Sequence, residues 1–272
     1  VTPIFPNCSG GNGEWGCEMI AENGTSVGRY GSIIVDNDGV AWASTSNDTG
    51  DGWFIVAKYV GSGGNCDTLY TGGSDRWQCE EVYDETLASS DDGFYSSSAI
   101  NPLTNKPSFT FTATTAGTDA KIVIADYIGS GGTGCTGGSS AYNCTTIMDP
   151  GYAGFGEGTS LQFSPTGVAS VVIRESSGGD VWFARYVGKG GNCDDDYSGS
   201  DAWTCEQIVT TGLVGETLNL VYDNAGVPWI STGNQDANDD LLIIKYVGSG
   251  GTNCGNTAWQ CTLVVDDVNV SS

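Results

Sequence analysis

The sequence contains no histidine and no run of 18 apolar residues. Without histidine, Ser-His-Asp and Cys-His nucleophilic catalysis are excluded. Without a long apolar run, we expect no membrane-spanning helix. No stretch shows the 3.6-residue apolar period of an amphipathic helix either. With 42 glycines among its 272 residues, the chain is instead typical of short strands and turns, and we predict an all-β protein.

Positive charge is scarce. Nine Lys and Arg stand against 33 Asp and Glu, which gives a formal net charge of −24. Contacts to phosphate groups need clustered cations, so nucleic acid is excluded as a partner. We interpret the acidity as that of a soluble surface exposed to cations or high salt, rather than as one specific binding site.

The ten cysteines form five close pairs, with 8, 12, 8, 11 and 6 residues between partners. The pairs are Cys8 and Cys17, Cys66 and Cys79, Cys135 and Cys144, Cys193 and Cys205, and Cys254 and Cys261. Zinc favours C-x₂₋₄-C spacing and often histidine, and neither is present. We therefore predict five local disulfides, which require an oxidising compartment. The start at Val1 rather than Met suits a secretory product whose signal peptide has been removed.

One phrase recurs around the cysteines. It reads "KYVGSGGNC" at 58–66, "DYIGSGGTGC" at 126–135, "RYVGKGGNC" at 185–193 and "KYVGSGGTNC" at 245–254. The first cysteines of successive pairs lie 58, 69, 58 and 61 positions apart, so the repeat is about 60 residues long. Before the phrase comes an apolar strand such as "WFIVAKYV" (53–60), and before that a hairpin such as "SIIVDNDGVAWAS" (32–44). Each repeat thus predicts four strands and one disulfide-closed hairpin.

Units of this size cannot bury their own faces, so they must pack against neighbouring units. We predict a β-propeller of four to five blades. Its parts are a half unit (1–30) and four units (31–94, 95–157, 158–214 and 215–272). The half unit leaves three arrangements open: four blades with an appended hairpin, five blades with one incomplete, or a sheet completed by a strand from a neighbouring molecule.

The phrase followed by "WQCEEV" (77–82) resembles the disulfide-bearing propeller-type repeats of bacterial extracellular and surface proteins. The resemblance covers nearly the whole chain and implies a fold and a location, but little about activity. Those repeats commonly carry a histidine in the second strand. Trp42, Ser108, Ser170 and Trp229 hold the equivalent places here, so any role of that histidine is absent.

An incomplete blade leaves an open sheet edge, and such an edge can pair with another chain. Our leading hypothesis is a non-enzymatic structural or adhesive protein, secreted or at a cell surface, that self-associates into a homopolymer or filament. The candidate assembly segments are Val1–Phe5 and Val268–Ser272, with Val1, Phe5, Val268 and Val270 as the apolar anchors. The alternative for these segments is a pair of frayed termini on a monomer.

Glycan binding is the second hypothesis. An aromatic residue stands two positions before every second cysteine: Trp15, Trp77, Tyr142, Trp203 and Trp259. Sugars stack on such rings, and five similar sites would give avidity. The alternative is that each ring packs against its disulfide.

Catalysis is the third and most remote hypothesis, as a glycoside hydrolase with two carboxylates. Glu18, Glu80 and Glu206 follow the second cysteine in three repeats, and this repetition argues for a structural role instead. We predict no cofactor. Calcium is the one ion considered, with Asp194, Asp195 and Asp196 as candidate ligands and a solvated acidic loop as the alternative. Five sequons, at Asn7, Asn23, Asn47, Asn143 and Asn269, permit glycosylation.

Overall fold

The computed structural model describes residues 16–22, 27–47, 52–84, 91–115, 119–152, 154–175, 177–195, 197–210, 214–234 and 240–265. These residues form four separate sheets, each of four antiparallel strands that pair in chain order. The all-β prediction is confirmed. The described residues hold one short helix, α1 (Cys66–Leu69), and no helix among them is long and apolar enough to cross a membrane.

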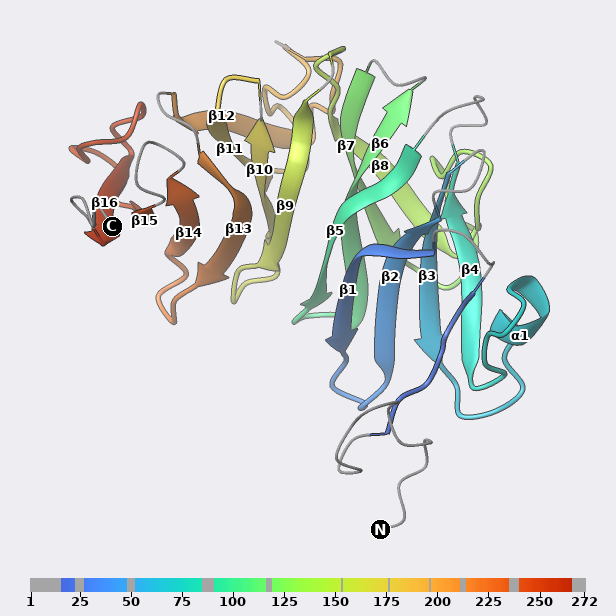
Figure 1. Cartoon of the computed structure of the whole chain (residues 1–272). Helices are drawn as coiled ribbons and strands as arrows, with labels where there is room; N and C mark the ends of the chain where they lie inside the picture. Colours follow the sequence, from blue (N-terminus) through green and yellow to red (C-terminus); the bar gives the residue numbers. More distant parts are fainter. Residues whose placement is uncertain are drawn as a thin grey trace, which may run out of the picture.

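The sheets are numbered here in chain order (Figure 1). Sheet 1 contains β1 (Val27–Val35), β2 (Ala41–Asn47), β3 (Trp53–Tyr59) and β4 (Trp77–Tyr83). Sheet 2 contains β5 (Asp91–Asn101), β6 (Lys106–Thr115), β7 (Asp119–Tyr127) and β8 (Tyr142–Met148). Sheet 3 contains β9 (Phe155–Phe163), β10 (Ala169–Glu175), β11 (Asp180–Tyr186) and β12 (Trp203–Val209). Sheet 4 contains β13 (Val214–Tyr222), β14 (Pro228–Asn234), β15 (Asp240–Tyr246) and β16 (Trp259–Val265).

Each sheet corresponds to one predicted repeat, but its first strand begins earlier than the predicted boundary. The strands start at residues 27, 91, 155 and 214, against predicted starts of 31, 95, 158 and 215. The extra residues include a glycine in three of the four strands, for example in "VGRY" (27–30) of β1. Irregular pairing in this stretch, with register shifts between Val27, Arg29 and Ser32, hides the period-2 alternation on which the sequence prediction relied.

Four predicted disulfides are confirmed: Cys66 to Cys79, Cys135 to Cys144, Cys193 to Cys205, and Cys254 to Cys261. Cys17 is also in a disulfide, and Cys8 lies outside the described residues.

The second glycine of the "GG" pair in the repeated phrase lies where no side chain fits. A Cβ atom at Gly64 would lie 2.1 Å from the carbonyl oxygen of Trp77, and one at Gly132 would lie 1.8 Å from that of Tyr142. Gly191 and Gly251 would clash in the same way with Trp203 and Trp259, at 2.0 Å each. The loop therefore crosses directly against the backbone of the fourth strand, and only glycine permits that approach.

The sheets pack face to face in series, with sheets 1 and 4 at the two ends (Figure 1). We call the face that a sheet turns to the next sheet its forward face, and the opposite one its backward face. Strand alternation assigns the residues: in sheet 1, Phe54 and Val56 point forward and Ile55 and Ala57 point backward.

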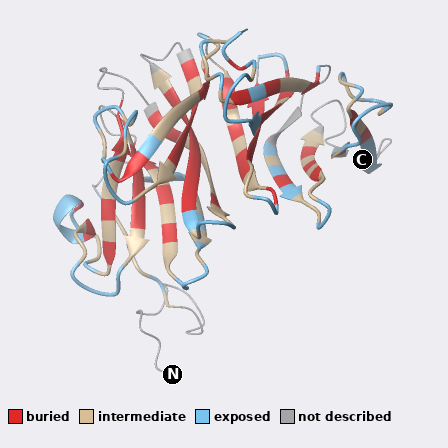
Figure 2. Cartoon of the chain, turned by 180° about the vertical axis from the view of Figure 1, so that it is seen from behind, coloured by how far each residue is buried: buried red, intermediate tan, exposed pale blue. Residues whose placement is uncertain are grey.

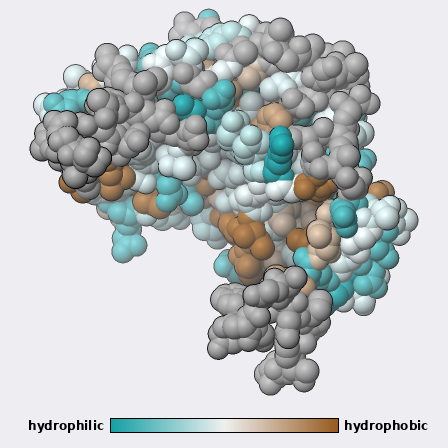
Figure 3. All heavy atoms as spheres, viewed as in Figure 1, coloured by the Kyte–Doolittle hydropathy of each residue, from teal (hydrophilic) through white to brown (hydrophobic). Residues whose placement is uncertain are grey.

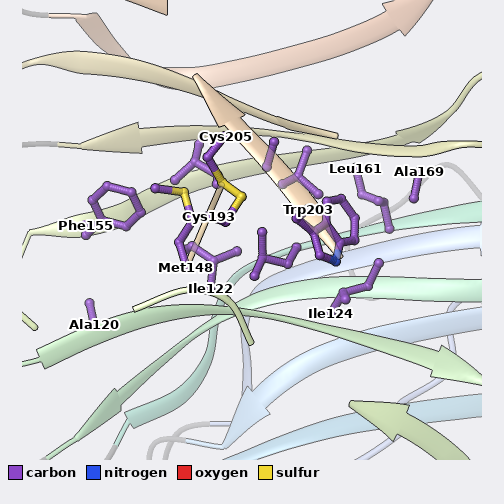
Figure 4. Packing of buried hydrophobic residues seen from close by; sticks show 14 of the residues in the cluster. Ala120, Ile122, Ile124, Met148, Phe155, Leu161, Ala169, Cys193, Trp203 and Cys205 are labelled. Atoms are coloured by element: carbon purple, nitrogen blue, oxygen red, sulfur yellow. A yellow bond between two sulfur atoms is a disulfide. The ribbon is translucent and has the colours of Figure 1, made fainter. Parts of the chain in front are cut away.

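Three apolar clusters fill the three junctions. Between sheets 1 and 2 lie Trp42, Phe54, Val56, Val82, Phe109, Phe111, Val123 and Tyr142. Between sheets 2 and 3 lie Ile122, Ile124, Met148, Phe155, Leu161, Ile173, Trp203 and the Cys193 to Cys205 disulfide (Figure 4). Between sheets 3 and 4 lie Val172, Val181, Phe183, Ile208, Leu220, Ile230, Ile244 and Trp259. Burial is accordingly concentrated on the strands and exposure on the loops (Figure 2).

We expect the junction between sheets 1 and 2 to be sensitive to truncation. Phe111 is fully buried and stacks on Phe54, with ring centroids 4.0 Å apart. Replacing Phe111 by Ala should lower the free energy of unfolding by about 3–5 kcal/mol, measured by urea denaturation. Leu103, which is 70% exposed in the β5–β6 turn, is the control: Leu103→Ala should change it by less than about 0.5 kcal/mol. Equal effects of the two substitutions would contradict this account of the core.

Candidate functional site

The repeated glutamate after the second cysteine joins neighbouring sheets. The Glu80 carboxylate on β4 accepts a hydrogen bond from the Ser139 hydroxyl, at 2.6 Å, and Ser139 lies in the disulfide loop of the next repeat. The Glu206 carboxylate on β12 accepts one from the Asn256 side chain, at 2.8 Å, again from the next loop. β4 and β12 are thus each fastened to the disulfide loop that follows in the chain. We call this contact the loop latch.

The latch also exists at the start of the chain. Glu18 accepts hydrogen bonds from the hydroxyl of Ser74 and from Nε1 of Trp77, and the backbone N–H of Ser74 donates to the Ile20 carbonyl at 3.2 Å. Residues 16–22 therefore occupy, against the backward face of sheet 1, the place of a fourth strand from a preceding repeat. The geometry gives the repeated glutamate a structural role.

Replacing Glu80 by Ala should remove one latch and leave its neighbours intact. The Ser139 hydroxyl is part-buried, so we expect a loss of about 1 kcal/mol in the free energy of unfolding. Glu22, whose alanine variant changes the net charge equally but breaks no latch between described sheets, is the control. A measured loss equal to that of the control would show that the latch does not contribute to stability.

The aromatic residues two positions before the second cysteines are buried. Trp77, Tyr142, Trp203 and Trp259 are exposed by only 6, 1, 2 and 0%. Each packs edge-on against the tyrosine of the repeated phrase, with centroid distances of 5.3, 5.4, 5.5 and 5.2 Å. A buried ring cannot stack on a sugar, so these four positions cannot be the glycan platforms that the sequence suggested. Trp15 lies outside the described residues.

The residue at one equivalent position of each sheet, which is Trp42 in sheet 1, Ser108 in sheet 2 and Ser170 in sheet 3, determines how well each junction is filled. In sheet 1, the Trp42 ring lies between two charged groups: its Nε1 donates to Asp36 at 3.1 Å, and the Lys58 ammonium lies 4.9 Å from the ring centroid. Trp42 packs on Tyr127 of sheet 2, 4.8 Å between centroids. The side chains of Trp42, Lys58 and Tyr127 together fill this end of the junction.

In sheets 2 and 3 the same place holds a serine, and cavities open. Beside Ser108 lies a cavity of about 370 Å³ between sheets 2 and 3. Between sheets 3 and 4 lies one of about 520 Å³, adjacent to Ser170, whose hydroxyl bonds the Tyr222 hydroxyl at 2.6 Å. Serine is far smaller than tryptophan, so the missing indole leaves space at the same end of each junction.

The two cavities carry opposite charges at one equivalent position. The residue before the tyrosine of the phrase is Lys58 in sheet 1, Asp126 in sheet 2, Arg185 in sheet 3 and Lys245 in sheet 4. Asp126 lines the smaller cavity and accepts a hydrogen bond from Ser108 at 2.5 Å. Burial raises the pKa of the Asp126 carboxyl, and the bond from Ser108 offsets part of that rise. Arg185 lines the larger cavity, together with Glu206 and Tyr222.

The sequence analysis missed both cavities. The signal was present as "DYIG" at 126–129, the one copy of the phrase in which an acidic residue replaces Lys or Arg. Its significance depends on Ser108, which lies 18 positions away on the neighbouring strand.

The cavities suit binding better than glycoside hydrolysis. The smaller is lined by one carboxylate, Asp126, and the larger by one, Glu206, which is held by the Asn256 amide. Hydrolysis of a glycosidic bond normally needs two opposed carboxyl groups. Neither of these described cavities brings such a pair together.

The calcium and glycosylation candidates lie elsewhere. Asp194 and Asp195 are in the loop closed by Cys193 and Cys205, and Asp196 lies outside the described residues. No three His, Cys, Asp or Glu side chains among the described residues are grouped as a metal site. Of the five sequon asparagines, Asn143 is exposed on β8 and Asn47 is buried in β2. The other three, Asn7, Asn23 and Asn269, lie outside the described residues. The candidate assembly residues also lie outside them: Val1, Phe5, Val268 and Val270.

The buried carboxyl of Asp126 should make stability depend on pH. Because its pKa is raised in the folded state, the protein loses stability as pH rises from the ordinary value of 3.8 through the raised value. Asp126→Asn keeps an oxygen for Ser108 and cannot ionise. We expect this variant to be more stable than the natural chain at pH 7 and equally stable below pH 3.8, by urea denaturation at both pH values. A pH-independent difference would contradict the assignment.

Comparisons with known proteins give the following. No family model matches the chain, and no curated protein matches it. Among solved structures, the polysaccharide lyase Uly1 matches with a TM-score of 0.43 and 9% identity, over 86% of this chain and 57% of that one. A protein of unknown function from Dyadobacter fermentans matches with a TM-score of 0.34 and 8% identity, over 84% and 81%. A bifunctional GH43-CE protein of Bacteroides eggerthii matches with a TM-score of 0.40 and 12% identity, over 91% and 29%. Similarity at this level does not establish a shared fold or activity.

Proposed function

We propose that this chain is a non-catalytic extracellular structural protein, that its four sheets are blades of a propeller-type array, and that copies assemble head to tail through the two end faces. The observation that carries the proposal is the apolar forward face of sheet 4. It has the residues of an internal junction but no described neighbour.

The forward face of sheet 4 matches the forward face of sheet 1 position by position. Val221, Trp229, Leu241, Ile243 and Val264 stand where sheet 1 has Ile34, Trp42, Phe54, Val56 and Val82. In sheet 1 these side chains pack against sheet 2, and Phe54 is fully buried. In sheet 4, Val221, Leu241 and Val264 are 49, 40 and 55% exposed. Such a surface has the chemistry of a protein junction.

The backward face of sheet 1 offers the complementary surface. Ile33 is 68% exposed, whereas Leu161 and Leu220, at the same position in sheets 3 and 4, are fully buried against a preceding sheet. A groove of about 350 Å³ runs along this face, between β1, β2 and the segment 16–22. Hydrophobic atoms gather over β1 in Figure 3, where Ile33 and Val35 are exposed.

A second copy fits both faces because the forward face of one sheet has already packed on the backward face of the next three times within the chain. Repeating that junction between molecules joins different patches on the two partners, and such head-to-tail contacts generate rings or filaments. Residues 16–22 hold the fourth-strand place on sheet 1, so the docking sheet must displace them. The proposed assembly is therefore a strand exchange near the N-terminus.

The remaining features support an extracellular location. Four disulfides in the described residues require an oxidising compartment. A net charge of −24 opposes association of copies, and salt screens that repulsion over about 8–10 Å. Assembly should consequently be favoured at high ionic strength.

Light scattering and negative-stain electron microscopy test the proposal. We expect the average mass to rise above 28.2 kDa with protein concentration and with salt, and ordered rings or fibres to appear. The double substitution Val221→Asp and Leu241→Asp should hold the protein at the mass of a monomer, because it places two charges in the junction.

Leu103→Asp is the control, since it charges an exposed side chain on neither end face. It should assemble like the natural chain. A natural chain that stays monomeric at every salt and protein concentration would overturn the proposal. So would a double variant that assembles normally.

A further inference from the structure

We infer that the cavity between sheets 2 and 3 is a binding site for an alkylammonium group, with the Asp126 carboxylate as its counter-ion and the Tyr186 ring as its wall. The ligand would be an organic cation that carries an ammonium head on a short apolar body. The inference rests on a comparison of this cavity with the filled junction between sheets 1 and 2.

The filled junction shows where an ammonium group lies. The Lys58 ammonium is 4.9 Å from the Trp42 ring centroid and 5.9 Å from that of Tyr127. Tyr127 belongs to the backward face of sheet 2, which closes this junction from the other side. The chain thus places one of its own ammonium groups against the tyrosine of the next repeated phrase, which is a favourable cation–π arrangement.

The next junction keeps the tyrosine wall but has no lysine at the position of Lys58. Tyr186 stands where Tyr127 stood, and its ring packs on Trp203 at 5.5 Å, as Tyr127 packs on Tyr142 at 5.4 Å. Ser108 and Asp126 replace the tryptophan and the lysine. The cavity of about 370 Å³ is lined by Ser108, Asp126, Tyr186 and Trp203, among others. A carboxylate therefore stands at the position that Lys58 holds in the filled junction.

The chemistry of the lining selects a cation. A carboxylate accepts hydrogen bonds from an ammonium group, and charge-assisted bonds of this kind are stronger than neutral ones. Ile124 and Phe163 supply apolar surface for an alkyl body. One cation of the chain, Lys106, also lines the cavity, but its ammonium donates to the Ile128 carbonyl at 3.2 Å.

The larger cavity serves as an internal contrast. It lies at the equivalent position between sheets 3 and 4, but Arg185 replaces Asp126 there. A guanidinium group in the place of the Asp126 carboxylate repels a second cation, and the one carboxylate that lines this cavity, Glu206, accepts a hydrogen bond from the Asn256 amide. We therefore expect the larger cavity to bind the same ligand more weakly. The net charge of −24 also attracts small cations to the protein and repels anions.

Titration calorimetry with n-butylammonium chloride and with n-butanol tests the site. Both probes have the same alkyl chain, and only one carries the ammonium group. We expect the natural chain to bind butylammonium at least tenfold more tightly than butanol. Equal affinities would mean that the cavity is only an apolar space, and this would overturn the inference.

Two variants locate the binding. Asp126→Asn removes the counter-ion and keeps the acceptor for Ser108, and it should lower butylammonium affinity at least tenfold. Tyr186→Leu removes the ring from a half-exposed position, and it should lower affinity severalfold. Asp67→Asn, which removes an exposed carboxylate on α1, is the charge-matched control and should bind like the natural chain. An Asp126→Asn variant that behaves like the control would overturn the inference. So would unchanged affinity of the Tyr186→Leu variant.

A lysine side chain of a partner protein carries the same group as a free amine. Titration with a lysine-containing peptide, blocked at both ends, separates the two sources. Tighter binding of the peptide than of butylammonium would assign a lysine side chain as the ligand. Weaker binding would assign a free amine.

Discussion

Every sheet of this protein carries apolar side chains on both faces, and each face must be covered by another sheet. The consequence is visible in burial: all seven residues of β10, in sheet 3, are buried, whereas β1, at one end of the series, has no buried residue. The hydrophobic effect stabilises each junction in proportion to the apolar area that the junction removes from water. In a series of such sheets, the outer faces of the first and last sheets stay exposed unless the series closes into a ring or another molecule covers them. The proposed head-to-tail assembly follows from this constraint, because it covers the exposed faces of sheets 1 and 4 with the same junction that the chain already forms three times.

The repeats share a backbone frame and differ in a few side chains, and these few side chains decide what each junction can do. The disulfide loop and the buried aromatic residue recur in all four sheets, and the latch joins β4 and β12 to the loops that follow them. Within that frame, Trp42 and Lys58 fill one junction, and Ser108 and Asp126 leave the next one open. Because protein interiors are close-packed, loss of an indole is not compensated by small shifts of rigid sheets, and the result is a cavity. The frame that the repeats share and the proposed binding site between sheets 2 and 3 thus depend on different residues.

The negative net charge of the protein has opposite effects on the proposed assembly and on the proposed cation binding. The excess of 24 negative charges repels another copy of the chain, so assembly needs screening by salt. The same excess attracts small cations, and it favours an ammonium group over an anion at Asp126. High salt should strengthen the first interaction and weaken the second. The two proposed interactions can therefore be distinguished by their opposite dependence on ionic strength.

The sequence by itself determined the strand-rich class, the length of the repeat, the four disulfide pairs that the structure describes, and the structural character of Glu18, Glu80 and Glu206. All of these follow from local patterns, since hairpins, short loops and cysteine pairs are formed by residues close together in the chain. Only the tertiary structure decided which aromatic rings are buried, which sheet faces lie open, and that Ser108 and Asp126 share a cavity wall with Tyr186. These properties depend on contacts between repeats about 60 residues apart. Whether a sheet face is exposed, or a junction contains a cavity, depends on which side chains a distant segment of the chain packs against it.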